Sequence, residues 1–121
     1  MDVLIQIVDD SPNMREAIKS VLSELSAEFI ESGDGDDAVK QFANQRPDLV
    51  IMDIRMGRID GIEATCAIRM ISPDAQVIVL TQYDDNDLRE AARSAGATAY
   101  VLKDDLSQLL NIIPKTPGEQ A

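Results

Sequence analysis

The chain has 121 residues, the usual size of one compact domain, and 22 acidic against 11 basic side chains give it a formal net charge of −11. Such a charge repels nucleic acid phosphates and anionic membrane surfaces, so we expect this segment to bind neither directly. The single cysteine, Cys66, and the absence of histidine exclude an internal disulfide and the usual zinc sites, so any bound metal ion should prefer oxygen ligands.

Apolar segments of strand length alternate with segments of helical periodicity, which is typical of parallel βαβ units. Five strands are expected, at Val3 to Val8, Ala27 to Glu31, Leu49 to Met52, Val77 to Leu80 and Ala99 to Leu102. The third and fourth are unbroken apolar runs, as in strands that are covered on both faces. The pattern predicts an α/β fold with a doubly wound parallel sheet.

Five helices are expected between and after these strands. Apolar residues at helical spacing indicate helices over 14–25, around 38–42 and 64–71, and over 88–95 and 106–113. Ser11 followed by Pro12 predicts the start of the first helix, and Gly96 predicts the end of the fourth.

Polar residues follow four of the expected strands. In a doubly wound sheet the functional crevice lies outside the carboxyl ends of the strands, where the sequence places Asp9, Asp10, Asp53, Thr81 and Lys103. Three clustered carboxylates repel one another unless a cation or a proton shares the site. Mg²⁺ prefers carboxylate, phosphate and water oxygens. We therefore expect Asp10 and Asp53 to bind Mg²⁺ directly, and Asp9 to act directly or through water.

These residue types suit phosphoryl transfer, which needs positioning and charge neutralisation more than covalent machinery. The Asp53 carboxylate can act as a nucleophile and form an acyl phosphate. Mg²⁺ and Lys103 would offset charge on the phosphoryl oxygens, and Thr81 would donate a hydrogen bond to one of them. Because Asp53 itself takes the phosphoryl group, we expect a phosphoacceptor with at most self-phosphorylation and self-dephosphorylation activity, and not an enzyme in the usual sense.

Each of these residues also has an ordinary structural explanation. Aspartates commonly end strands or cap helices, threonine is common in strands, and a lysine is usually a solvated charge. For any one residue alone, the structural explanation is at least as good as the functional one. Their joint placement at the ends of four strands favours a shared site. Asp60 and Gly61 are interpreted as a turn and a helix start.

Over Val3 to Ile113 the chain resembles the receiver domains of two-component response regulators. The resemblance rests on residues in family order and at family-like spacing: the pair Asp9-Asp10, the stretch from Asp53 to Gly61, Thr81, Tyr100 and Lys103. It implies a flavodoxin-like fold with strand order 2-1-3-4-5. The receiver domain would cover residues 1–113, and residues 114–121 would form a C-terminal tail or the start of a linker.

The resemblance also implies a role for each residue of the motif. Asp53 would be the phosphoacceptor, assisted by Thr81 and Lys103. The metal ion, Mg²⁺ or Mn²⁺, would be bound by Asp9, Asp10, Asp53 and the backbone carbonyl of Arg55.

Thr81 and Tyr100 look like the family's switch pair. In the family, the hydroxyl moves toward the phosphoryl group and the aromatic ring turns inward, which changes the surface of the fourth helix, fifth strand and fifth helix. Here that surface, a candidate homodimer interface, would include Leu88, Arg89, Tyr100, Leu106 and Leu110. The implied phosphodonor is a sensor histidine kinase or a phosphotransfer protein, docked beside the first helix near Asn13, Met14 and Ile18.

Three positions depart from the family pattern. Gly57 stands where proline is usual, which would relax the backbone beside Asp53. Asp104 stands where proline commonly follows the lysine, so the bond before it is open to either isomer. Gln82 replaces a small residue at the pocket mouth. Our hypothesis is that Gln82, Arg55 and Tyr83 restrict water access and alter the lifetime of the phosphorylated form.

Two other functions are open. A receiver-like interaction module that acts without phosphorylation usually lacks one of the acids, the hydroxyl or the lysine, and all are present here. An aspartyl-phosphate phosphohydrolase usually carries a second acid two residues after the nucleophile, where this chain has Arg55. No apolar run approaches the roughly 20 residues of a membrane span, and no signal-peptide pattern is present, so a cytoplasmic protein is expected.

Overall fold

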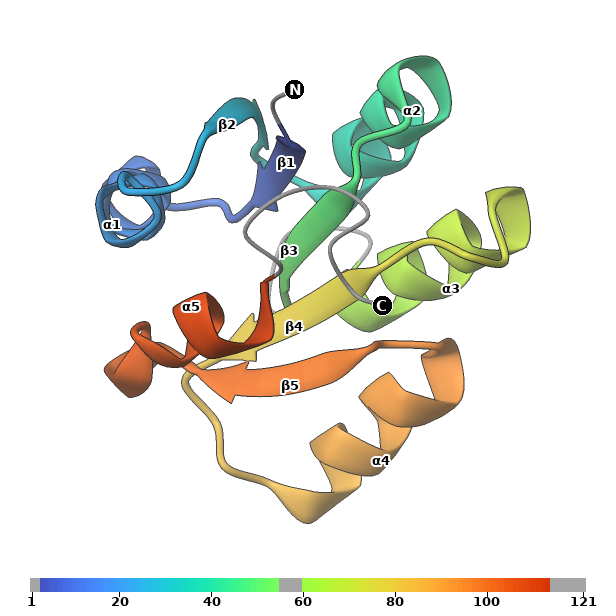
Figure 1. Ribbon diagram of the computed structural model, residues 1–121. Coiled ribbons are helices and arrows are strands. Elements are labelled where there is room, and N and C mark those ends of the chain that lie inside the picture. The colour runs from blue at the N-terminus through green and yellow to red at the C-terminus, as the bar shows by residue number, and fades with distance from the viewer. Residues whose placement is uncertain (1–2, 55–59, 114–121) are drawn as a thin grey trace.

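The computed structural model describes residues 3–54 and 60–113. Five parallel strands form one sheet in the order β2-β1-β3-β4-β5 (Figure 1). The strands are β1 (Val3–Val8), β2 (Ala27–Ser32), β3 (Leu49–Asp53), β4 (Val77–Thr81) and β5 (Ala99–Leu102). The predicted doubly wound sheet and its strand order are confirmed. Strands β2, β3 and β4 each extend one residue past the predicted end, so that Asp53 and Thr81 are strand residues.

Helices cover both faces of the sheet (Figure 1). On one face lie α1 (Pro12–Val21) and α5 (Gln108–Ile112), and on the other lie α2 (Gly35–Gln45), α3 (Gly61–Ile71) and α4 (Asn86–Ala95). Every residue of β3 and β4 is buried, as expected for central strands that are covered on both faces. Burial of these strands stabilises the fold and holds the carboxyl ends of β3 and β4 in a fixed position relative to each other.

The helices begin where side chains can cap them. A side-chain oxygen accepts a backbone N–H of the first turn in four of the helices, from Ser11 in α1, Asp34 in α2, Asp60 in α3 and Asp85 in α4. Gly96 ends α4 with a φ of +104°, a left-handed conformation that glycine adopts without strain. The predicted start of the first helix and end of the fourth are confirmed.

Two helices are shorter than their apolar patterns. The first ends at Val21, although Leu25 still packs against the core. In the last, a 3₁₀ turn over Lys103–Asp105 precedes α5, and Leu106 lies in the connection. Apolar residues in a turn can continue a helical spacing, so periodicity alone overestimates helix length. The bond between Lys103 and Asp104 is trans.

The helices of the described residues are too short or too polar to cross a bilayer. The described residues are 3–54 and 60–113. The predicted C-terminal segment, 114–121, lies outside these ranges.

Candidate functional site

The carboxyl ends of four strands bring the predicted site residues to one edge of the sheet. The register pairs Val8 with Met52 at the ends of β1 and β3, so Asp9, which directly follows β1, and Asp53, the last residue of β3, lie at the same level. Thr81 is the last residue of β4, and Lys103 directly follows β5. Asp9, Asp53 and Thr81 are buried, whereas Lys103 is partly covered.

Three carboxylates are clustered at this edge. Asp9, Asp10 and Asp53 each present one oxygen, and these oxygens lie within 4.8 Å of one another. Asp10 is exposed while the other two are buried, so the cluster is open to solvent on one side. Mutual repulsion favours a cation here. Oxygen ligands beside an open side suit Mg²⁺, which retains waters and binds phosphate oxygens. The residues present therefore fit a hard divalent cation.

An ammonium group lies against the same carboxylates. Lys103 Nζ is 2.9 Å from Asp9 Oδ2 and 3.2 Å from Asp53 Oδ1. Burial by itself would lower the pKa of Lys103, but the hydrogen bond to Asp9 and the negative charge of Asp53 outweigh it and raise that pKa. Lys103 is therefore charged at neutral pH and joins the ends of β1, β3 and β5.

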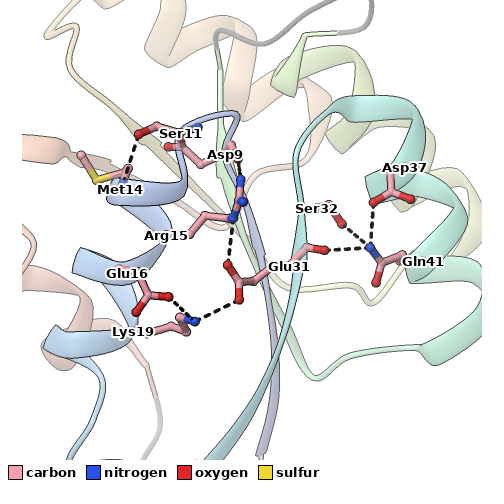
Figure 2. A network of polar contacts seen from close by, with 10 residues as sticks. All are labelled: Asp9, Ser11, Met14, Arg15, Glu16, Lys19, Glu31, Ser32, Asp37 and Gln41. Atoms are coloured by element: carbon pink, nitrogen blue, oxygen red, sulfur yellow. Dashed lines mark hydrogen bonds and ion pairs between the residues drawn. The ribbon is translucent and has the colours of Figure 1, made fainter.

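Asp9 is held by its neighbours on several sides. The Ser11 N–H donates to Asp9 Oδ1 (2.9 Å), and the Asp9 N–H donates to the carbonyl of Ser32 (3.0 Å). Arg15 Nη1 donates to the main-chain oxygen of Asp9 (2.6 Å), and Arg15 Nε donates to Glu31 (2.8 Å) (Figure 2). Arg15 and Glu31 are not among the residues that the sequence predicts for the site. In the sequence, the only indication that Arg15 belongs to the site is its position as a basic residue one helical turn after Ser11.

Glu31 is the centre of an ion-pair network on the surface of α1 and β2. Its carboxylate contacts Arg15 Nε at 2.8 Å and Lys19 Nζ at 2.9 Å, and Lys19 also contacts Glu16 at 2.5 Å (Figure 2). The hydrogen bonds from Lys19 and then from Arg15 lower the pKa of Glu31.

This lowered pKa predicts how Glu31 contributes to acid stability. In the folded state the pKa lies below the unfolded value of about 4.3, so ionised Glu31 stabilises the fold above that pH. The contribution is lost as the pH falls through the folded-state pKa. We expect Glu31→Gln to lower the unfolding free energy at pH 7 by about 0.5–1 kcal/mol, the size of exposed ion pairs.

Urea unfolding at a series of pH values measures this effect. The difference between parent and Glu31→Gln should narrow toward pH 3. Glu28→Gln, at an exposed position of the same strand, is the matched control. A difference of constant size across the series would assign the effect to packing and not to charge.

Thr81 and Tyr100 are connected through the main chain of Tyr83. The Tyr83 N–H donates to Thr81 Oγ1 (3.2 Å), and the Tyr100 hydroxyl donates to the Tyr83 carbonyl (2.6 Å). The Arg89 guanidinium lies 4.5 Å from the centroid of the half-buried Tyr100 ring. Burial raises the pKa of Tyr100. One hydrogen-bonded path therefore runs from the end of β4 to β5.

The predicted pocket modulators are only partly described. Gln82 Nε2 donates to the Tyr83 hydroxyl (2.9 Å), and both side chains are exposed just beyond Thr81. Arg55, with its predicted metal-binding carbonyl, and Gly57 lie outside the described residues.

The start of α3 packs against the backbone that carries Asp53. The Gly61 N–H donates to the Ile54 carbonyl (2.7 Å), and Asp60 and Glu63 form a reciprocal capping box. The structural interpretation of Asp60 and Gly61 is confirmed.

Comparison with known proteins decides the family. A sequence profile described as the response regulator receiver domain matches residues 5–114. The chain belongs to this family. Receiver domains are components of two-component systems and act as signalling switches rather than as classical enzymes. They are generally phosphorylated by histidine kinases and bind Mg²⁺ at an acidic pocket, and the aspartate cluster of this receiver domain could bind such an ion.

Individual relatives support the assignment. The transcriptional regulatory protein PdtaR of Mycobacterium tuberculosis is 42% identical over 100 residues, which are 80% of this chain and 47% of PdtaR. A LuxR-family two-component response regulator from Aurantimonas sp. SI85-9A1 has a TM-score of 0.86 at 29% identity, covering 92% of this chain and 81% of that one. One chain of the CheX–CheY–BeF3–Mg complex from Borrelia burgdorferi has a TM-score of 0.84 at 26% identity, covering 90% of this chain and 84% of that one. This receiver domain spans about half the length of the curated relatives it matches.

Proposed function

We propose that this receiver domain accepts a phosphoryl group on Asp53 and responds by changing its output surface. The observation that carries the proposal is the contact of Lys103 Nζ with both Asp9 and Asp53, within an open cluster of carboxylates. Phosphoryl transfer depends on a positioned nucleophile and on neutralisation of the phosphoryl charge. The contact of Lys103 with Asp53 supports both requirements at this edge of the sheet.

The proposed donor is a phosphohistidine of a sensor histidine kinase or a phosphotransfer protein. The Asp53 carboxylate attacks phosphorus, the new P–O bond forms as the P–N bond breaks, and the histidine nitrogen keeps the electron pair of the broken bond. Lys103 attracts the phosphoryl oxygens by its charge, and Thr81 donates a hydrogen bond to one of them.

A divalent cation fits the same site. Mg²⁺ or Mn²⁺, when bound, would neutralise further charge on the phosphoryl oxygens. We propose that Asp9, Asp10, Asp53 and the backbone carbonyl of Arg55 hold it. The similar Borrelia complex is described as containing BeF3 and Mg²⁺, which supports a metal-dependent site by similarity.

Incubation with Mg²⁺ and a small phosphodonor such as acetyl phosphate, followed over time by intact-mass spectrometry, tests the proposal. We expect one persistent phosphoryl adduct per chain, and none when EDTA removes the metal ion. Turnover of many phosphoesters without an adduct would instead indicate a phosphohydrolase. No adduct at any donor concentration would indicate an interaction module that works without phosphorylation.

The proposed output runs through Thr81 and Tyr100. When Thr81 Oγ1 turns toward the phosphoryl group, it would no longer accept the Tyr83 N–H, and this change would reach the Tyr100 hydroxyl through its hydrogen bond to the Tyr83 carbonyl. The affected surface of α4, β5 and α5 contains five half-buried side chains, Leu88, Arg89, Tyr100, Leu106 and Leu110. Two of them, Arg89 and Tyr100, help to line a pocket of about 220 Å³ between α4, β5 and the segment that joins them. We propose this surface as a homodimer interface, to be checked by solution mass with and without a phosphoryl mimic.

The donor is proposed to dock beside the start of α1. Asn13 is exposed and Met14 half-buried, so both are accessible to a partner, but Ile18 is buried in the core. The predicted docking surface is therefore corrected to exclude Ile18.

We propose that this segment acts in the cytoplasm, binds no nucleic acid or membrane directly, and forms its receiver domain from residues 1–113.

Gln82→Ala is expected to shorten the lifetime of the phosphorylated form several-fold. The Gln82 side chain donates a hydrogen bond to the Tyr83 hydroxyl beside Thr81. Removal of the Gln82 amide should admit water to the acyl phosphate. The decay of the phosphoryl adduct, followed by intact mass, measures this rate. Gln76→Ala, at the opposite end of β4, is the matched control. Equal decay rates in Gln82→Ala and the parent would refute the hypothesis.

A further inference from the structure

We propose that Arg15 is a positioning residue that holds Asp9 for the divalent cation and acts through the Asp9 main chain. The proposal rests on the metal-dependent function proposed above. Arg15 Nη1 donates to the main-chain oxygen of Asp9 at 2.6 Å, while Arg15 Nε donates to Glu31 at 2.8 Å. Figure 2 shows the Arg15 side chain extending from α1 toward Asp9 and Glu31.

Asp9 needs support because it lies beyond the end of a strand. Strand β1 ends at Val8, and Asp9 is the buried residue that follows it. Its carboxylate faces those of Asp10 and Asp53, which repel it. Loss of the Arg15 hydrogen bond would let the Asp9 backbone shift under this repulsion. The carboxylate oxygens would then lie too far apart for octahedral Mg²⁺, which tolerates little distortion.

The geometry of Arg15 matches this task. A guanidinium is always charged and presents its donors in a rigid plane, so one group can bind two acceptors in fixed directions. The side chain is 19% exposed, and Glu31 fixes its orientation from the other side. Arg15 does not contact the clustered carboxylates in any interaction that we observe among the described residues. It therefore acts on the metal site through the backbone.

A purely structural role would look different. Arg15 also links α1 to β2 through Glu31, and Lys19 makes the same kind of link, with Nζ 2.9 Å from the other Glu31 oxygen. The difference between the two cations is the bond to Asp9. Lys19→Met therefore removes a Glu31 partner and leaves the Asp9 contact in place, which makes it the matched control.

The experiment measures Mg²⁺ binding by isothermal titration calorimetry and thermal unfolding in EDTA for the parent, Arg15→Met, Arg15→Lys and Lys19→Met. We expect Arg15→Met to weaken Mg²⁺ binding about 10- to 100-fold, the usual loss when a residue that orients a metal ligand is removed. Lys19→Met should bind Mg²⁺ like the parent. Arg15→Lys should also bind Mg²⁺ weakly, because one ammonium group cannot replace the two hydrogen bonds that the guanidinium donates to Asp9 and Glu31. Saturating Mg²⁺ should restore phosphorylation of Arg15→Met.

Several results would overturn the proposal. Equal Mg²⁺ affinity in Arg15→Met and Lys19→Met would reduce Arg15 to a link between α1 and β2. Parent-like affinity in Arg15→Lys would show that charge suffices without positioning, and this variant carries the test if Arg15→Met does not fold. Absence of Mg²⁺ binding by the parent would instead overturn the proposed function itself.

Discussion

Asp53→Asn is expected to abolish the phosphoryl adduct, with a loss of about 10³-fold or more in the rate of its formation. An uncharged amide is a very poor nucleophile for phosphorus, so the substitution removes the reacting group and keeps its shape. Intact mass after incubation with Mg²⁺ and acetyl phosphate measures the effect. Asp74→Asn, at an exposed aspartate in the turn between α3 and β4, should behave like the parent.

This loss should not result from unfolding. The variant has one charge fewer in a cluster of three carboxylates, and Lys103 keeps its contact with Asp9. Relief of repulsion should leave the melting temperature in EDTA equal to that of the parent or higher. An adduct of parental yield in Asp53→Asn would place the phosphoacceptor at another residue.

Gly61→Ala is expected to destabilise the fold by about 3 kcal/mol or more, at the upper end of the cost of overpacking. A Cβ at this position would lie 1.9 Å from the main-chain oxygen of Asp53, 2.7 Å from its carbonyl carbon and 2.9 Å from Ile54 Cα. All three are backbone atoms, so no side chain can rotate away. The start of α3 must move, and with it the end of β3 that carries Asp53.

Urea unfolding compares Gly61→Ala with Gly33→Ala. At Gly33 the nearest atom to an added Cβ is Arg15 Nη1 at 3.9 Å, an ordinary contact, so this control should change the unfolding free energy by no more than about 0.5 kcal/mol. Gly61→Ala should also weaken Mg²⁺ binding. Similar free energies of unfolding for the two variants would show that the start of α3 can move at little cost and does not support Asp53.

The strands and the location of the site could be predicted from the sequence because both follow from short-range patterns. Apolar runs mark the central strands, and parallel topology brings the residues after each run to one edge. Asp9, Asp53 and Lys103 lie in contact for this reason. The resemblance to receiver domains added the strand order, which apolar patterns alone leave open.

Contacts between elements could not be predicted in the same way. Arg15 and Glu31 are 16 positions apart, and neither breaks the pattern of its helix or strand. Gln6 is apparent in sequence as an amide in a buried strand, but its partners, Ser32 Oγ and the carbonyl of Ala38, depend on where α2 packs. The end of α1 at Val21 could not be predicted either, because the turn after it carries further apolar residues that continue the helical spacing.

The attachment of α4 has a consequence for how a signal leaves the site. Ala92 is the only fully buried residue of this helix. Among the described residues, its cluster has two other fully buried members, Ile54 and Val79, and four partly buried side chains pack against it, Ile62, Leu88, Ala97 and Tyr100. Stabilisation by burial scales with apolar area, so α4 should open to deuterium exchange at a lower free energy than the central strands. Because Ile54 directly follows Asp53 and packs in the same cluster as Ala92, a shift at the end of β3 would change the packing that attaches α4 to the sheet.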